Sequence, residues 1–225
     1  MLIEFKNVTV SLDDRLVLSN LNLTLREGRI GVIGSNGSGK STLVRLINGL
    51  VQPSAGVVHV DDLSVTQDSR ALRRRVGFVF QNPDNQLVLP IVGEDLLWGL
   101  DAKAFSLVQR EQKVRAVLGS LDLLDLLPRS VHTLSGGEKQ LVALAGVLVT
   151  EPELIIFDEP TTQLDLRMRN RLVDIIDQLP QQAIVVSHDL PLVERMDRVL
   201  VIDRGTVAFD GNPQDAVAWY RKNCA

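Results

Sequence analysis

The sequence predicts an α/β fold in which a parallel sheet carries an antiparallel β subdomain and an inserted α-helical subdomain. Three short apolar runs, GRIGVIG, ELIIFDE and AIVVSHD, each end in polar residues. Central parallel strands have this form, because both of their faces are buried and polar groups gather at their carboxyl ends. Leucines alternate over 16–25, as in half-buried strands, whereas residues 82–150 show almost no strand pattern. A helical insertion in an α/β core accounts for all three observations.

The individual elements follow from the same periodicities. Strand patterns occupy 2–10, 16–25, 29–33, 57–60, 76–80, 154–157, 183–187, 198–202 and 206–209, with a hairpin turn at 203–205. Helical patterns occupy 40–49, 106–127, 136–149, 166–178 and 213–222. We therefore expect a single domain, 1–225, in which 1–81 and 151–225 form the core with its β subdomain and 82–150 form the helical subdomain.

The composition limits the class of protein. The 225 residues suffice for one large domain, and a net charge of −4 lacks the basic footprint of a general nucleic-acid binder. The single cysteine, Cys224, permits no internal disulfide, which fits a reducing compartment. The N-terminus has no signal-peptide pattern, and the most apolar run, 141–149, is far shorter than the roughly 20 residues that span a bilayer. We expect no nucleic-acid partner and a chain that is soluble by itself, which leaves room for a peripheral role on a membrane.

The stretch GSNGSGKST follows a predicted strand and precedes a predicted helix. This is the P-loop spacing in the context that it requires. Backbone amides of the loop and of the helix N-terminus bind phosphate oxygens, Lys40 reaches the β- and γ-phosphates, and the Ser41 hydroxyl binds Mg²⁺. A glycine-rich turn without a ligand is the alternative, and it leaves the flanking strand and helix unexplained. The predicted phosphate-binding residues are Gly34, Ser35, Asn36, Gly37, Ser38, Gly39, Lys40, Ser41 and Thr42.

Polar residues at the ends of other predicted strands supply the rest of a nucleotide-hydrolysing site. Asp158 ends the run LIIFD and can hold Mg²⁺, and Glu159 follows as a general base for an attacking water. Gln81 ends the run VGFVF, which places an amide near Mg²⁺ and that water. His188 ends VVSH, where an imidazole can contact a γ-phosphate. The alternatives are that the Asp-Glu pair caps a strand and that the lone histidine is structural.

The stretch LSGGEKQ opens a predicted helix. Ser135 is a good N-cap, and Gly136 and Gly137 allow a close backbone approach, so this helix start presents amides to an anion. Because it belongs to the predicted insertion, away from the P-loop, we expect it to complete the site of another copy of the chain.

Taken in order, these segments resemble an ABC-type nucleotide-binding domain, a P-loop NTPase with a RecA-like core, over essentially the whole chain. The matching segments are Walker A at 34–42, the Q-loop at Gln81, the signature at 134–138, Walker B at 154–159, the D-loop at 161–165 and the switch His188. The resemblance implies a head-to-tail homodimer that sandwiches two ATP molecules with Mg²⁺. Each ATP lies between the P-loop of one copy and Ser135, Gly136 and Gly137 of the other, and Asp165 helps to couple the two sites.

The chain departs from the family pattern at several positions. Glu138 stands where Gln is commonest, Leu141 replaces a frequent Arg, and Thr162 and Gln163 are unusual in the D-loop. The aromatic residue that would stack on adenine is missing from VSLDDR, where Leu12 is the nearest candidate. The phosphate-binding residues are intact, so ATP remains the expected ligand, with loose selectivity for the base.

The stretch FQNPDNQ, with GEDLLWGL after it, resembles more narrowly the ATPases of energy-coupling factor (ECF) importers, which take up vitamins and transition-metal ions. In that family the segment after the Q-loop faces the membrane partner. We expect an exposed apolar groove that receives a partner helix, although the same residues could pack inside the helical subdomain. The expected groove residues are Leu87, Val88, Leu89 and Ile91, next to Leu96, Leu97 and Trp98.

The sequence therefore predicts the ATP-hydrolysing subunit of an ECF-type importer, peripheral to the cytoplasmic face of the cell membrane. Its partners would be a second ATPase copy, an integral membrane coupling subunit and a substrate-binding membrane subunit. The chain ends soon after its last predicted helix, which resembles the dedicated biotin and cobalt or nickel systems and favours biotin slightly. The alternatives are the ATPase of a conventional ABC transporter, a soluble ABC protein of DNA repair or translation, and a small-molecule kinase. FQNPDNQ favours the first function over the second, and the missing coiled-coil or tandem cassette weighs against the third.

Overall fold

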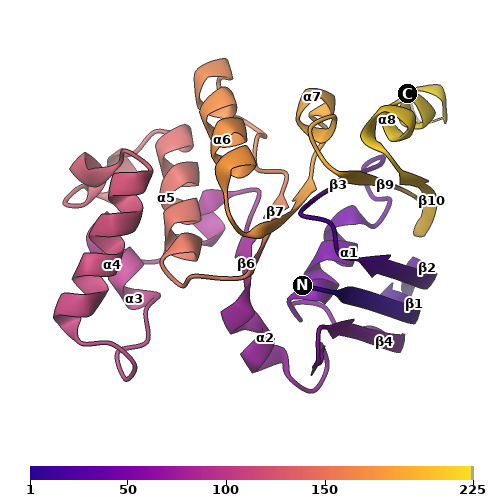
Figure 1. Cartoon of the computed structure of the whole chain (residues 1–225), viewed down its shortest axis with the longest axis horizontal. Helices are drawn as coiled ribbons and strands as arrows, with labels where there is room; N and C mark the ends of the chain where they lie inside the picture. Colours follow the sequence, from indigo (N-terminus) through magenta and orange to yellow (C-terminus); the bar gives the residue numbers. More distant parts are fainter. Residues whose placement is uncertain (224–225) are drawn as a thin grey trace. The chain divides into compact units, whose positions relative to one another are not determined.

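The computed structural model describes residues 1–223, so Cys224 lies outside the described part of the chain. Its larger sheet has six strands in the order β10-β9-β3-β8-β7-β6 (Figure 1). The strands are β3 (Arg29–Ile33), β6 (Val76–Val79), β7 (Leu154–Asp158), β8 (Gln182–Val186), β9 (Arg198–Asp203) and β10 (Thr206–Gly211). β3, β7, β8 and β9 pair in parallel and β10 runs antiparallel to β9. Every residue of β7 is buried, which confirms the parallel core that the apolar runs predict.

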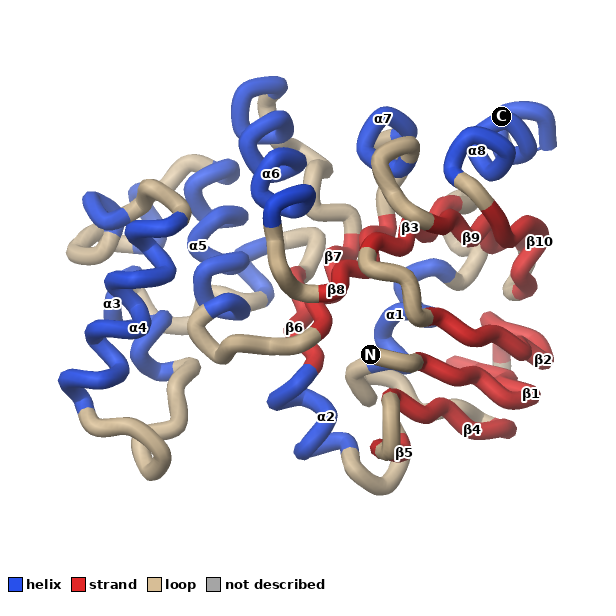
Figure 2. The backbone as a smooth tube through the Cα atoms, viewed as in Figure 1, coloured by secondary structure: helices blue, strands red, loops and turns tan. Residues whose placement is uncertain are grey.

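A smaller antiparallel sheet has the order β2-β1-β4-β5. Its strands are β1 (Ile3–Leu12), β2 (Arg15–Leu25), β4 (Ala55–Val60) and the two-residue β5 (Leu63–Ser64). Ile3 pairs with Leu25 on one side and with Val60 on the other, and all three side chains are buried. The tube in Figure 2 shows these strands as a separate group from the strands of the larger sheet. The predicted antiparallel β subdomain is therefore present.

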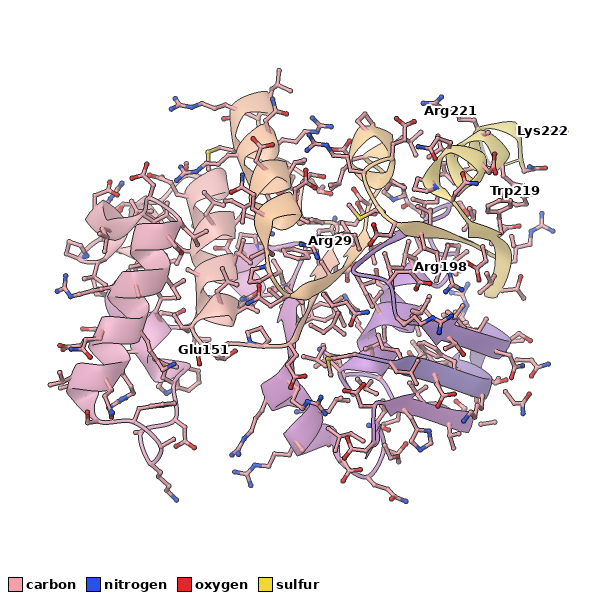
Figure 3. All side chains as sticks on the ribbon, viewed as in Figure 1. Arg29, Glu151, Arg198, Trp219, Arg221 and Lys222 are labelled. Carbon is pink, nitrogen blue, oxygen red and sulfur yellow. The ribbon has the colours of Figure 1, made fainter. Side chains whose placement is uncertain are left out.

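Two arginines of the larger sheet, Arg29 and Arg198, form hydrogen bonds between neighbouring segments, and both are labelled in Figure 3. Arg198 on β9 binds Asp210 through two bonds of 2.6 Å and donates to the Thr24 carbonyl oxygen of β2 at 2.9 Å. Arg29 at the start of β3 donates to the carbonyl oxygens of Leu179 and Gln181, just before β8. The bonds of Arg29 lie at the start of β3 and just before β8, and the predicted site residues follow the other ends of these two strands.

Four helices accompany the two sheets: α1 (Lys40–Ile47), α2 (Ser69–Arg75), α7 (Leu190–Val193) and α8 (Pro213–Asn223). The sequence predicted α1 and α8 and missed the other two. α2 buries only Leu72, so it lacks a repeating apolar face, and α7 is a single turn. Neither is long enough to show helical periodicity.

The chain forms two compact units. The first contains Met1–Phe78, Glu153–Pro160 and the chain from Leu179 onward. The second contains Val79–Pro152 and Thr161–Gln178. The sequence grouped 161–178 with the core, but α6 (Leu166–Gln178) packs on α5 (Gly136–Leu148) within the helical unit.

The helical unit also contains α3 (Val92–Trp98), α4 (Leu107–Ser120) and short 3₁₀ turns at Pro83–Asn85, Leu124–Leu126 and Val131–Thr133. The predicted helix 106–127 is wrong at its end, because α4 stops at Ser120 and Asp122 adopts a left-handed φ of 54°. Leu96, Val114, Leu118 and Leu144 form part of the buried core of this unit. Among residues 1–223, no helix is both long and apolar enough to cross a membrane.

Candidate functional site

The loop between β3 and α1 depends on its glycines. Gly34, Gly37 and Gly39 have φ values of 151°, 76° and 109°, which side-chain-bearing residues rarely adopt. A Cβ on Gly34 would lie 2.1 Å from the Ile202 carbonyl oxygen, and one on Gly39 would lie 2.6 Å from Leu18 Cδ2. A Cβ on Gly37 would meet no atom within 4 Å, so the loop is open on that side.

The first turn of α1 has the form of an anion site. Gly39 is its N-cap and supplies no side-chain cap, so the backbone amides of this turn keep their hydrogen-bonding capacity. Ser38 Oγ is buried and has no hydrogen-bond partner within residues 1–223. A buried hydroxyl without a partner is costly. These residues therefore fit a phosphate group, which would accept from the amides and from Ser38.

Lys40 is held against the same loop. Its Nζ donates to the carbonyl oxygens of Gly34 at 2.8 Å and Ser35 at 2.9 Å, and the side chain is buried. Burial lowers the pKa of Lys40, because it disfavours the charged form, while the negative charges of Glu159 and Asp158 act in the opposite direction. An ammonium group has three N–H donors, so one can point away from the loop toward a ligand.

Asp158, at the end of β7, joins the loop to the sheet. Its Oδ1 accepts from the Ser41 hydroxyl at 2.9 Å, and its Oδ2 accepts from Arg45 at 3.1 Å. A hydroxyl and a carboxylate are oxygen ligands of the kind that Mg²⁺ prefers. The sequence analysis missed Arg45, because a helix position by itself does not reveal which strand end lies beside it.

Glu159 and His188 meet beyond the ends of β7 and β8. Glu159 has a left-handed φ of 54°, and its Oε1 lies 3.0 Å from His188 Nε2. Its other oxygen accepts the His188 backbone N–H at 3.2 Å. Burial raises the pKa of Glu159. Burial also lowers the pKa of His188, and the positive charge of Lys40 lowers it further. The pair thus combines a carboxylate whose basicity is increased with an imidazole whose neutral form is favoured.

The helical unit contains the start of α5, where Ser135 is the N-cap as predicted. Glu138 Oε2 accepts from the Ser135 backbone N–H at 2.7 Å, and Ser135 Oγ accepts from the Glu138 backbone N–H at 3.3 Å, so the two residues form a capping box. The Ser135 hydroxyl also donates to Glu138 Oε2 at 2.8 Å. Arg129 donates to the other Glu138 oxygen at 3.3 Å. The bonds from Ser135, followed by the charge of Arg129, lower the pKa of Glu138.

The two glycines after Ser135 differ in their surroundings. A Cβ on Gly136 would meet nothing within 4 Å, whereas one on Gly137 would lie 2.6 Å from Met168 Cγ of α6. Gly136 therefore faces open space, and Gly137 is required for the packing of α5 on α6. Asp165 caps α6, because its Oδ1 accepts the Met168 N–H at 2.8 Å.

The groove that the sequence predicts after Gln81 is only partly exposed. Val88 and Trp98 are 64% and 68% exposed, and Leu87, Leu89, Ile91 and Leu97 are half-buried. Leu96 is 1% exposed, so its predicted place in the groove is wrong. It faces the core of the helical unit because it lies on the opposite side of α3 from the exposed residues. Leu12, named for the base, ends β1 opposite Arg15 and is exposed.

The predicted site residues thus fall into two sets. Residues 34–42, Asp158, Glu159 and His188 come together in the first unit. Gln81, Ser135, Gly136, Gly137 and Asp165 belong to the second unit. The family model described as "ABC transporter" matches residues 18–162, a range that includes both the P-loop and Glu159. The chain belongs to the ABC transporter family.

Relatives extend the family likeness over nearly the whole chain. An ABC transporter ATP-binding protein of Deinococcus radiodurans is 52% identical over 98% of both chains. The biotin transport ATP-binding protein BioM of Rhizobium etli is 45% identical over the full length of both. The solved structure of cbiO1 from Clostridium perfringens, part of the ABC transporter complex cbiONQ, has a TM-score of 0.82 and 33% identity, covering 98% of this chain and 93% of that one.

Membership of the ABC transporter family establishes the general chemistry. The domain binds ATP and hydrolyses it. The fold agrees, since the parallel core, the antiparallel sheet and the helical unit are those of the ABC ATPase architecture. In the first unit, the residues that fit this chemistry are the P-loop, the carboxylates at the end of β7 and the histidine after β8.

Proposed function

We propose that this chain is the ATP-hydrolysing subunit of an ECF-type importer that takes up a vitamin or a transition-metal ion, with biotin favoured slightly. The observation that supports this most is the combination of the P-loop cluster with FQNPDNQ, the stretch that resembles ECF ATPases. The similarity to BioM, a biotin transport ATP-binding protein by name, and to cbiO1, part of the ABC transporter complex cbiONQ, supports the same proposal.

The first unit would bind the phosphates and supply the base. Amides of residues 34–42 and the Lys40 ammonium would hold the β- and γ-phosphates. When bound, Mg²⁺ would neutralise phosphate charge, and Ser41, Asp158 and Gln81 are the residues that would hold it. Glu159 would accept a proton from the attacking water, which its raised pKa favours. His188, whose backbone N–H donates to Glu159 and whose Nε2 lies 3.0 Å from Glu159 Oε1, would orient the base and contact the γ-phosphate.

The second unit would act on a second copy of the chain. Ser135, Gly136 and Gly137 would close over ATP that is bound to the P-loop of the partner copy, in a head-to-tail homodimer. Gly136, which faces open space, would let the backbone approach the phosphate. Asp165, at the start of α6, would couple the two sites of the dimer.

The membrane partner would contact the exposed residues Val88 and Trp98, which follow the polar turn after Gln81 in the sequence. This would place the chain on the cytoplasmic face of the membrane, in complex with a coupling subunit and a substrate-binding subunit. Val88→Glu should reduce substrate uptake at least tenfold, because a charge in an apolar interface is costly to bury. ATP binding by the isolated chain should not change, and unchanged uptake would show that this surface does not face the partner.

The decisive experiment is to tag the chain, solubilise native membranes gently and identify what co-purifies. Two small integral membrane proteins, one of which binds a vitamin or metal ion, would support the ECF importer and identify its substrate. A pair of large permease subunits would instead assign the chain to a conventional ABC transporter. Recovery without any membrane protein would assign it to the soluble ABC proteins.

A further inference from the structure

The backbone of Phe80, directly before Gln81, is held on both sides by glutamine side chains. Its N–H donates to Gln86 Oε1 at 3.4 Å, and its carbonyl oxygen accepts from Gln140 Nε2 at 3.3 Å. Gln140 is 2% exposed, so its amide is bonded where water cannot replace the partner. Strand β6 ends at Val79, and the backbone of Phe80, the next residue, is bonded to these two side chains.

Both glutamines lead to the same helix. Gln140 is itself a residue of α5, and Gln86 Nε2 donates to the Ala143 carbonyl oxygen of α5 at 2.7 Å. The two partners of Gln86 fix its amide orientation, because one must be met by the oxygen and the other by the nitrogen. A third link, from Asp84 Oδ1 to Lys139 Nζ at 2.7 Å, joins the same turn to α5 on the more exposed side.

The polar turn 82–86 therefore points much of its hydrogen-bonding capacity inward. The two 3₁₀ bonds and the Asn82 cap shape the turn, while Asp84 and Gln86 use their side chains on α5. A pocket of about 150 Å³ lies beside it, lined by Gln81, Leu134, Gly136, Gln140 and Gln163 among others. Gln81 borders this open space and is exposed, whereas Phe80 directly before it is bonded to Gln140 of α5.

We infer that Gln86 and Gln140 are positioning residues that join Gln81 to α5, so that a displacement of Gln81 is transmitted to Ser135 at the start of that helix. The inference rests on the proposed function, in which Gln81 responds to Mg·ATP. A helix of 13 residues moves as one body, because its backbone bonds are continuous. The role of FQNPDNQ is then internal as well as partner-facing, since its last residue links the nucleotide-sensing glutamine to the signature helix.

Hydrogen exchange tests the link in the monomer, where no second copy can touch Ser135. The chain is held at a concentration at which light scattering shows a monomer, and exchange is compared with and without Mg·ATP in segments 79–86 and 134–143. We expect both segments to slow together in the unaltered chain. In Gln86→Ala and Gln140→Met the first segment should still respond, while the response of 134–143 should fall at least fivefold.

Asn85→Ala is the matched control, because Asn85 lies exposed in the same turn and uses only its backbone there. It should keep the response of both segments. Thermal unfolding establishes that each variant is folded, and if buried Gln140 does not tolerate Met, half-buried Gln86 decides the question. A second measurement, steady-state hydrolysis, should show a fall in kcat of severalfold with the KM for ATP unchanged.

The outcomes separate the two proposals. If 134–143 responds equally in Gln86→Ala and in the unaltered chain, the link is overturned. If 79–86 responds in the unaltered chain but 134–143 does not, the link is overturned and the proposed function stands. If neither segment responds although ATP binds, the role of Gln81 in the proposed function fails as well.

Discussion

The N-termini of α1 and α5 both have glycine at or beside the first helical residue, yet the two helix starts differ in how their backbone amides are capped. α1 begins at Gly39, which has no side chain to cap it, and the nearby Ser38 hydroxyl is buried without a partner in the described chain. The N-cap of α5 is Ser135, which forms a capping box with Glu138, and Arg129 lies beside the carboxylate. The first helix start therefore carries unmet hydrogen-bonding capacity, and the second already holds an anionic group of its own.

The difference indicates that the start of α1 can bind a phosphate at any time, whereas the start of α5 can bind one only under certain conditions. An uncapped helix start with a buried hydroxyl gains from a phosphate at any time. At the capped helix start, the Ser135 hydroxyl must leave Glu138 before it can bind another oxygen. In the proposed dimer, the P-loop would thus bind ATP first, and α5 of the second copy would engage only when the closed state supplies better contacts.

Glu159→Gln should have a large effect on turnover. Removal of the general base should lower kcat about 10²–10⁴-fold, with ATP binding retained. In the presence of ATP this variant should accumulate as a dimer, in which the Ser135 hydroxyl has left Glu138 and binds the phosphate. Size-exclusion chromatography with ATP would detect the dimer. Hydrolysis at the native rate would show that the base is another residue.

A mixing experiment tests whether the two helix starts serve one site from two chains. Ser135→Arg should abolish turnover because of its bulk and charge at the start of α5, and Lys40→Ala should abolish it through the P-loop. In a mixture of the two variants, one site of each mixed dimer is intact, so activity should return to roughly a quarter of normal if chains pair at random. Absence of any recovery would contradict the shared site.

A matched pair of glycine substitutions sharpens the comparison at the level of the backbone. Gly39→Ala should destabilise the fold and weaken ATP binding, because the Cβ meets Leu18 at a left-handed φ. Gly136→Ala should leave the free energy of unfolding unchanged or raise it by about 0.5–1 kcal/mol, because Ala favours the helix and has room there.

Gly39→Ala should lower stability, whereas Gly136→Ala should lower turnover alone. For Gly136→Ala, turnover should fall severalfold although stability does not, because the Cβ occupies the space that a phosphate needs. Denaturant unfolding and ATPase assays on the same preparation check this. Normal turnover with Ala at 136 would mean that open space at this helix start has no part in binding.

The smallest effect concerns pH. The folded-state pKa of Glu138 is lowered by its bonds from Ser135, so the carboxylate stabilises the fold above its unfolded pKa, and this contribution is lost as pH falls through the folded value. Glu138→Gln should therefore be less stable than the unaltered chain by up to about 1 kcal/mol near pH 7, and this difference should vanish as pH falls through the lowered folded-state pKa of Glu138. Urea unfolding across this range measures it, and a difference independent of pH would show that charge at this cap is unimportant.

The sequence predicts the local features of both regions well. The P-loop, the carboxylates after β7 and the N-cap Ser135 follow from spacing within short segments, where neighbours in sequence are neighbours in space. Features that depend on distant segments escaped prediction. The Arg45–Asp158 contact joins residues 113 positions apart, and the buried side of α3 at Leu96 depends on how the helical unit packs.

The sequence by itself determined the α/β class, the glycine-rich loop before α1 and the membership of the ABC transporter family, because periodicity and motif spacing are properties of contiguous residues. Only the tertiary structure decided that α6 belongs with the helical unit and that Leu96 is buried. It also decided that Gln86 and Gln140 hold Phe80 to α5, across 6 and 60 positions of sequence. The physical reason is that side-chain hydrogen bonds and packing partners are chosen by proximity in the folded chain, which no local pattern encodes.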